Sequence, residues 1–209
     1  MRRLHVLGRK NHGKTTLVAE LVAELTRRGW RIGTIKHTHH HHELDTPGKD
    51  SHRHRLAGSQ VVGILSPRMN AVFWEPAPVA EPSSPPHIPG AVEAETHRYA
   101  DFERFMHACD LVVVEGDTMT DADKIEVWRA GLESRPIAAG QPSILAMVTD
   151  DDLPPELTSR QTPAGDARDN EAGDAGPPLL RFPRADLGPL LGWIEERYLK
   201  PLSREDSRQ

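Results

Sequence analysis

The sequence predicts an α/β fold in which a mostly parallel sheet is flanked by helices. A glycine-rich loop at residues 8–16 separates a short apolar run from an amphipathic segment, as between a strand and a helix. A second apolar run at residues 30–36 completes a strand–helix–strand unit, whose two strands should be parallel. Residues 111–114 are continuously apolar, which is typical of a central parallel strand.

The loop has the GxxxxGK[ST] spacing of a phosphate-binding loop, or Walker A motif, because residues 8–15 read GRKNHGKT. Its two glycines allow a backbone path on which N–H groups face phosphate oxygens, beside the positive N-terminus of the next helix. Lys14 can reach the β- and γ-phosphates, and the Thr15 hydroxyl is placed to bind Mg²⁺. We therefore expect a P-loop NTPase-like fold that binds a nucleoside triphosphate. The predicted contacts in this loop are Gly8, Asn11, His12, Gly13, Lys14, Thr15 and Thr16.

The first half of the chain then continues as helices and strands. Apolar residues at helical spacing predict a helix over residues 15–28, which Gly29 should end. After the strand at 30–36, a proline–glycine turn at 47–48 precedes an expected helix at 49–57. Further strands are expected at residues 61–66 and 71–74.

The second half contains two segments that differ in composition from the rest. Residues 76–98 are rich in proline and predict an exposed loop, and residues 150–178 are acidic and rich in glycine and proline, which predicts a disordered insert. Between and after them we expect a helix at 99–107, strands at 124–129 and 143–148, and a terminal helix at 187–199. Together these elements predict one nucleotide-binding domain over residues 1–200, followed by a flexible tail at 201–209.

Composition narrows the class of protein. The formal net charge of −5 provides no basic surface for bulk nucleic-acid binding. A single cysteine, Cys109, rules out an intramolecular disulfide, and its place beside an apolar run favours a buried thiol over a reactive one. The longest apolar runs are too short to span a membrane. We therefore expect a soluble cytoplasmic protein.

Glu115 is the candidate second acid of the site. Phosphate-binding loops work with an acid at the C-terminal end of a neighbouring strand, where it orders Mg²⁺ or water. Glu115 ends the run at 111–114, and Gly116 after it allows a close approach. We predict Thr15 and Glu115 as the metal ligands and Glu115 as the one catalytic candidate; the alternative is an acid at a strand end with no special role.

The chain after the second strand supplies the remaining polar candidates. His37 follows that strand directly, at the rim where open α/β sheets bind ligands. The histidine run at residues 39–42 is compatible with a metal site, with phosphate or substrate contact, or with a solvated tract. Asp50 and Arg53 share a helix face, so they either pair with each other or contact the ligand.

Several of these segments together resemble one known family. The motifs are residues 8–16, then GTIKHTHH at 33–40, DTPGKDS at 45–51, VVEG at 113–116, KIE at 124–126 and the strand at 144–148 followed by Thr149 and Asp150. In combination and at these distances, they are similar to the molybdopterin-guanine dinucleotide biosynthesis protein B (MobB) family. The resemblance covers most of the chain outside the proline-rich and acidic segments.

This resemblance implies a P-loop fold that binds GTP with Mg²⁺, and molybdopterin as a further candidate ligand. It implies an accessory role in attaching a guanine nucleotide to molybdopterin, together with a partner nucleotidyltransferase. It also implies a homodimer and at most slow GTPase activity. His37, Asp50 and Glu115 occupy motif positions of the family.

The sequence departs from the family pattern at two places. Family members commonly carry small residues where this loop has residues 9–12, and an Asp-aromatic-Asp run where this chain has residues 41–43. The Asn-Lys-x-Asp guanine-reading motif of small GTPases is absent, and Asp150 is our candidate substitute.

We therefore predict a GTP-binding accessory protein of molybdenum-cofactor biosynthesis. One alternative is a metallochaperone GTPase, in which the histidine run would load a metal. The other is a small-molecule kinase, for which Arg53 and Arg55 would have to serve as lid arginines.

Overall fold

The computed structural model describes residues 1–38, 43–74, 99–162 and 178–200. The chain divides into two compact units, residues 1–38 with 99–209 and residues 39–98. The sequence predicted one domain over residues 1–200 and did not anticipate this division. The predicted proline-rich loop, the histidine run at 39–42 and the C-terminal tail lie outside the described residues.

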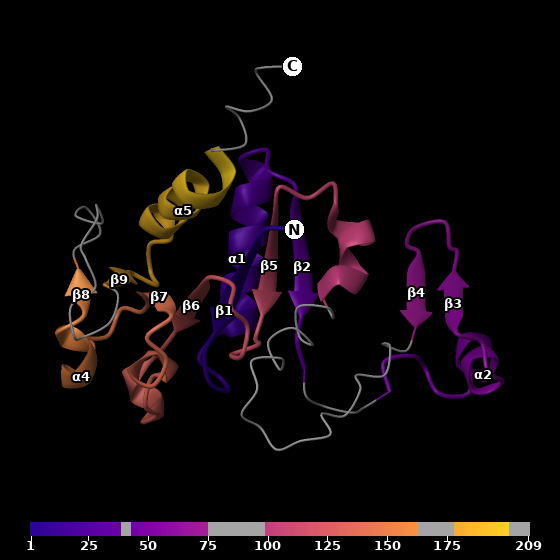
Figure 1. Ribbon diagram of the computed structural model, residues 1–209, viewed down its shortest axis with the longest axis horizontal. Helices are drawn as coiled ribbons and strands as arrows, with labels where there is room; N and C mark the ends of the chain where they lie inside the picture. Colours follow the sequence, from indigo (N-terminus) through magenta and orange to yellow (C-terminus); the bar gives the residue numbers. More distant parts are fainter. Residues whose placement is uncertain (39–42, 75–98, 163–177, 201–209) are drawn as a thin grey trace. The chain divides into compact units, whose positions relative to one another are not determined.

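The first unit contains a seven-stranded sheet in which each strand pairs with its neighbours in parallel. The strand order is β2-β5-β1-β6-β7-β9-β8, which can be followed from right to left in Figure 1. In chain order the strands are β1 (Arg3–Leu7), β2 (Ile32–Lys36), β5 (Leu111–Glu115), β6 (Lys124–Val127), β7 (Ile144–Val148), β8 (Gln161–Thr162) and β9 (Leu179–Phe182). The predicted mostly parallel sheet flanked by helices is confirmed.

Successive strand residues point to opposite faces, and helices cover both. One face packs against α1 (Lys14–Arg27) and α5 (Gly188–Ile194), with Val113 of β5 in this core. On the other face Val112 and Val114 pack against a helix at residues 99–106, and Leu7 packs with short elements from the C-terminal half. Because both faces are buried, residues 111–114 of β5 are continuously apolar, as the sequence indicated, whereas the neighbouring strands β1 and β6 also bury His5, Lys124 and Glu126.

Helix α1 begins and ends within one residue of the predicted range, 15–28. It follows directly from Gly13, and four of its apolar residues, Leu17, Val18, Leu21 and Leu25, are buried. At its end Gly29 has a φ of +96°, the N–H of Gly29 donates to Thr26 O and that of Trp30 donates to Leu25 O. This is a Schellman arrangement, which needs a residue that tolerates the left-handed conformation.

The C-terminal half is more ordered than the sequence suggested. Helix α4 (Pro155–Thr158) and strand β8 lie inside the segment predicted to be a disordered insert, so that prediction does not hold for residues 155–162. Leu157 is fully buried, and the Arg160 guanidinium donates to the carbonyls of Ala138 and Pro142. Burial of Leu157 and the hydrogen bonds of the buried Arg160 therefore order residues 155–162 despite the acidic composition of the segment.

The C-terminal helix agrees with its prediction with one irregularity. Helix α5 continues into a π-helical turn, Glu195–Leu199, so that the whole covers residues 188–199. Its end is fixed to the sheet layer because the Tyr198 hydroxyl donates to Asp123 at 2.6 Å.

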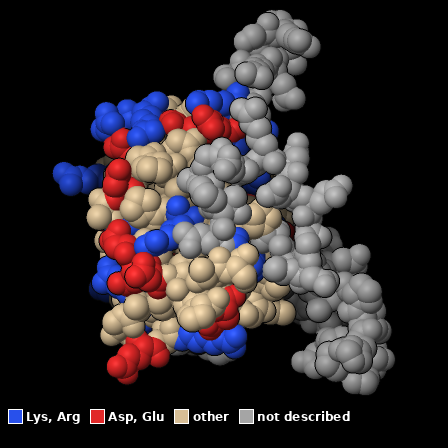
Figure 2. Space-filling view, turned by 90° about the vertical axis from the view of Figure 1, so that its left-hand side faces the viewer, with Lys and Arg blue, Asp and Glu red and all other residues tan. Residues whose placement is uncertain are grey.

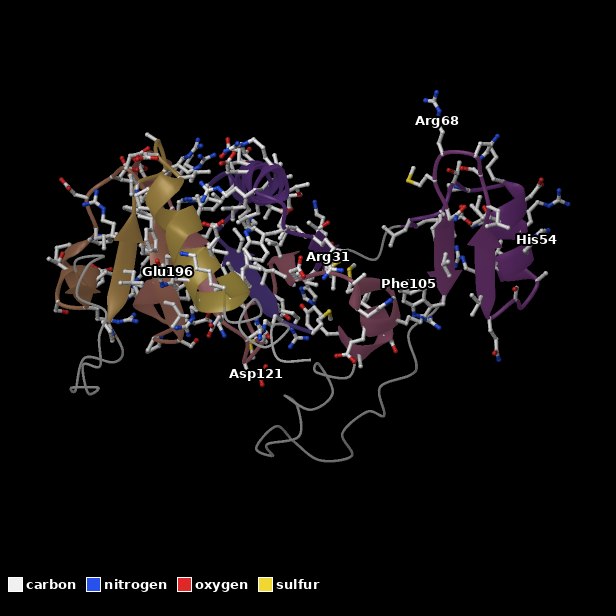
Figure 3. All side chains as sticks on the ribbon, turned by 90° about the horizontal axis from the view of Figure 1, so that it is seen from above. Arg31, His54, Arg68, Phe105, Asp121 and Glu196 are labelled. Atoms are coloured by element: carbon white, nitrogen blue, oxygen red, sulfur yellow. The ribbon has the colours of Figure 1, made fainter. Side chains whose placement is uncertain are left out.

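The second unit consists of a short helix and a hairpin. Helix α2 (Asp50–Leu56) precedes β3 (Val61–Ile64) and β4 (Ala71–Trp74), which pair antiparallel, with Arg68 in the turn between them (Figure 3). Val62 is buried, but the unit exposes several large apolar side chains. These are Leu44, Leu56, Val61, Ile64, Leu65, Met69 and Val72.

On the side shown in Figure 2, acidic and basic side chains are interspersed, unlike the continuous basic face of many nucleic-acid-binding proteins. Among the described residues, no helix is both long enough and apolar enough to cross a membrane.

Candidate nucleotide-binding site

The parallel sheet brings the ends of its strands to one edge, and the candidate site lies there. Strand β1 leads into the phosphate-binding loop and lies between β5 and β6. In the register of the sheet, Val6 pairs with Glu115 on one side and with Ile125 on the other. The loop is therefore flanked by the chain that leaves β5 and by the chain that leaves β6.

The loop backbone requires its glycines. Gly8 and Gly13 have φ values of +149° and +97°, and Asn11 between them is also left-handed at +69°. A Cβ on Gly8 would lie 2.6 Å from the carbonyl oxygen of Val127, which is closer than such contacts allow. The first glycine of the motif is thus required by the close approach of β6, in addition to the phosphate geometry.

Lys14 lies across the mouth of the loop. Its Nζ donates to Arg9 O at 2.9 Å, so the side chain reaches back from the end of the loop to the second loop residue. Partial burial lowers the pKa of Lys14, Glu115 opposes that shift and Lys36 adds to it. A bound anion would favour the charged form of this amine.

The two predicted metal ligands are in direct contact. The Thr15 hydroxyl donates to Oε1 of Glu115 at 2.8 Å, although the two residues are 100 positions apart in the chain. A hydroxyl and a carboxylate provide the hard oxygen ligands that Mg²⁺ prefers, and Mg²⁺ commonly completes its shell with water and phosphate oxygens. The residues present therefore fit this ion.

His12 does not direct its side chain at a ligand. It is 1% exposed, its Nδ1 accepts from the N–H of Arg129 at 3.0 Å, and its Nε2 is 2.7 Å from the Ser134 hydroxyl. Burial, then the nearby cations Lys14, Arg129 and Arg9, lower the pKa of His12, so the ring is neutral and Nε2–H is the donor to Ser134. The sequence placed His12 among the nucleotide contacts, but its ring bonds to Arg129 and Ser134, and its N–H donates to Arg9 O at 3.4 Å.

The sequence reading missed the segment that holds the loop, which is the chain after β6. Besides the two contacts to His12, Arg135 O accepts from Nε of Arg9 at 2.9 Å. The Trp128 indole N–H donates to Ser134 O at 2.8 Å and fixes the segment internally. These partners lie more than 100 residues from the loop, and no local pattern in the sequence signals such pairing.

A shallow hollow of about 290 Å³ opens on this same segment. Trp128 and Pro154 line it, together with acidic residues and Arg135. Ser134 and Arg135 both line the hollow and contact the phosphate-binding loop. A molecule in the hollow would therefore lie beside the loop.

The family model described as "Molybdopterin guanine dinucleotide synthesis protein B" matches residues 3–150, well over half of the chain. The chain belongs to the MobB family. The matched span includes the phosphate-binding loop and Glu115.

Individual MobB relatives agree with this assignment. A molybdopterin-guanine dinucleotide biosynthesis adapter protein of Escherichia coli K12 is 35% identical over 124 residues, which are 59% of this chain and 63% of that protein. The adapter protein of Haemophilus influenzae is 32% identical over 147 residues, or 70% of this chain and 73% of its own length. The crystal structure of Bacillus subtilis MobB has the same fold, with a TM-score of 0.56 at 16% identity over 95% of this chain and 98% of that one.

Of the remaining candidates outside the loop, one lies at the same edge of the sheet and two lie in the second unit. His37 directly follows β2, and its N–H donates to Glu115 O at 2.9 Å, so it lies at the same edge of the sheet as Glu115. Asp50 and Arg53 belong to α2 in the second unit. Among the described residues of that unit no ion pair joins them; instead Arg55 pairs with Glu43.

Asp150 has a structural role in the MobB fold of this chain. Its Oδ1 accepts from the N–H groups of Arg184 and Ala185 at 2.8 and 2.9 Å, which anchors the loop after β9. The residue is exposed and follows β7 at the edge that carries the phosphate-binding loop. Guanine reading by Asp150 stays a prediction.

The histidine run at residues 39–42, which the sequence offered as a metal site, lies outside the described residues. In the four ranges that are described, no cluster of three or more histidine, cysteine or acidic residues is arranged to hold a metal ion.

Proposed function

We propose that this chain is a GTP-binding adapter protein that assists the conversion of molybdopterin to its guanine dinucleotide form. The observation that carries the proposal is the contact of Thr15 with Glu115 at a complete phosphate-binding loop, inside the span that matches the MobB family. The names of the E. coli and H. influenzae relatives supply the adapter role. A nucleotidyltransferase of molybdenum-cofactor biosynthesis would be the partner.

In the proposed complex each loop residue has a distinct task. Backbone N–H groups of the loop and the N-terminus of α1 would receive the phosphates, and Lys14 would leave Arg9 O to reach them. Thr15 and Glu115 would hold Mg²⁺, which neutralises phosphate charge when bound. We propose slow GTP hydrolysis at most, with Glu115 as the one catalytic candidate.

Substitution of Lys14 tests the binding site. We expect Lys14→Ala to abolish measurable GTP binding in calorimetry and to leave the melting temperature close to that of the wild type, because the one hydrogen bond of the amine within the described residues goes to a loop carbonyl. Lys200→Ala is the matched control, since it removes an exposed amine that pairs with Glu196 at 3.5 Å. Unchanged GTP affinity in Lys14→Ala would contradict the phosphate-loop assignment. Comparable affinity for ATP and GTP would contradict guanine specificity.

The adapter role has its own experiment. The chain is expected to co-purify with a molybdenum-cofactor nucleotidyltransferase, and the complex is scored for bound nucleotide and pterin. Molybdopterin in the isolated chain would support it as a direct ligand. Sedimentation at several concentrations tests the homodimer that we also propose, and a strictly monomeric chain would contradict it.

A further inference from the structure

The chain that leaves β6 follows the phosphate-binding loop closely, and one of its side chains has no assigned role. The backbone of Val127 lies under Gly8, and the N–H of Arg129 donates to His12 at 3.0 Å. Residues 127–129 therefore run along the loop from its first glycine, Gly8, to His12, which precedes its second glycine. Their position is fixed by backbone contacts, which do not depend on the side chain at position 129.

The Arg129 side chain reaches over the last glycine of the loop. A Cβ built on Gly13 would lie 3.2 Å from Nη2 of Arg129 and 3.8 Å from its Cζ. Arg129 is exposed, and within the described part of the chain no carboxylate forms an ion pair with its guanidinium. A larger residue at position 13 would displace this group, so the glycine and the guanidinium fit each other.

Several positive charges gather near the guanidinium, although the Asp151 carboxylate accepts from the N–H of the next residue, Ala130, at 2.8 Å. Lys14, Arg9 and Arg129 all act on His12 as nearby cations, and the N-terminus of α1 adds its partial positive charge at the same place. Like charges held together repel, and an anion between them removes that repulsion. A guanidinium suits this position because its planar donors bind two phosphate oxygens at once.

We propose that Arg129 is a nucleotide-binding residue that donates to oxygens of the α- or β-phosphate. This inference rests on the proposed GTP binding and adds a residue to that site. The α- and β-phosphates are chosen because the loop backbone around Gly13 receives these groups, whereas Lys14 extends toward the β- and γ-phosphates. The guanidinium would close the side of the loop that β6 flanks.

Titration of wild type, Arg129→Ala and Arg129→Lys with GTP, GDP and inorganic pyrophosphate tests the proposal. We expect Arg129→Ala to weaken all three ligands by a similar factor of about ten or more, as for a lost charge-assisted hydrogen bond. Arg129→Lys should recover part of the affinity, because it restores the charge without the planar donors. Thermal melting should be unchanged, since the backbone bond to His12 remains.

Arg27→Ala is the matched control. It also removes one exposed guanidinium, but at the opposite end of α1, where Arg27 pairs with Glu24. We expect its affinities to equal those of the wild type. Equal GTP affinity in Arg129→Ala and wild type would overturn this proposal alone, as would a loss for GTP without a loss for GDP. A wild type that binds no GTP would overturn the proposed function together with it.

Discussion

Two histidines in the first twelve residues, His5 and His12, are buried and neutral. His5 in β1 is fully buried, its Nδ1–H donates to Gly116 O at 3.2 Å, and burial lowers its pKa to about 4. His12 is held neutral between Arg129 and Ser134. Both rings hold backbone that belongs to the site. His5 holds Gly116, the residue after Glu115, and His12 holds the phosphate-binding loop against the chain after β6.

His5 should make the protein less stable in acid. In the unfolded chain its pKa is near 6.5, so between pH 6.5 and about 4 the unfolded state binds a proton that the folded state does not. Stability therefore falls as pH falls through this window, by about 3 kcal/mol from this residue. Urea unfolding of wild type and His5→Gln across the window measures it. The variant should show a shallower fall, whereas His54→Gln, which changes an exposed histidine (Figure 3), should match the wild type.

Glu115 should control the metal dependence of nucleotide binding. Glu115→Gln keeps the shape of the side chain and an oxygen for the Thr15 hydroxyl, but it removes the negative charge that favours Mg²⁺. We expect Mg²⁺ to raise GTP affinity in the wild type and to raise it at least about tenfold less in the variant. Glu196→Gln, at an exposed position of the C-terminal helix (Figure 3), serves as control. An unchanged Mg²⁺ effect in Glu115→Gln would remove Glu115 from the metal site.

At this scale the sequence predicts the residues whose roles follow from local spacing. The motif positions Lys14 and Thr15 could be named from the loop alone, and Glu115 from its place at a strand end. The burial of His12 and the approach of Arg129 could not, because each depends on a partner more than 100 positions away. Asp150 was named for its place after a strand, but its carboxylate also anchors a loop that the sequence did not connect with it.

Among the secondary-structure elements, the phosphate-binding loop and β6 depend on each other. Gly8 faces the carbonyl of Val127, and a side chain there would force the two strands apart. The spacing of the loop can be recognised in the sequence. That Gly8 is also required by the nearby carbonyl of Val127 can be seen only in the structure. Strand β9 and helix α4 were not predicted, since each has four residues and adjoins an acidic segment that obscures its apolar pattern.

Alanine substitutions at two glycines separate close contact from backbone strain. Gly8→Ala combines the left-handed backbone with a contact of 2.6 Å to a carbonyl oxygen, and we expect it to cost about 3 kcal/mol of unfolding free energy. Gly29 also has a positive φ, +96° against +149° at Gly8, but open space surrounds the new methyl group of Gly29→Ala, so about 1 kcal/mol is expected. Urea unfolding measures both. Equal losses would show that the contact with Val127 relaxes without cost.

The whole molecule is acidic, but its nucleotide site is basic. The formal net charge is −5, whereas Arg9, Lys10, Lys14 and Arg129 lie in or over the loop. A distant negative charge is screened by salt, and so is the attraction of a phosphate by exposed cations. Ionic strength therefore sets the balance between repulsion of the phosphates by the acidic remainder and their attraction by the loop cations.

The affinity for GTP should therefore fall as salt rises from about 0.05 M to about 0.5 M, because the loop cations act at shorter range than the acidic remainder. Arg129→Ala should show a shallower dependence, since one of these cations is gone. Fluorescence titration with a labelled guanine nucleotide at several salt concentrations measures both slopes. A GTP affinity that rises with salt would mean that repulsion by the acidic body dominates.

The contacts between the phosphate-binding loop and the chain after β6 also limit how this protein can be engineered. A loop from another nucleotide-binding protein, grafted onto residues 8–15 alone, would leave the Arg129 N–H and the Ser134 hydroxyl without His12, and the Arg135 carbonyl without Arg9. The smallest piece that can be exchanged as a unit is therefore discontinuous and comprises residues 8–15 together with 127–135. Chimeras that exchange both segments should keep a folded loop, and those that exchange one should not.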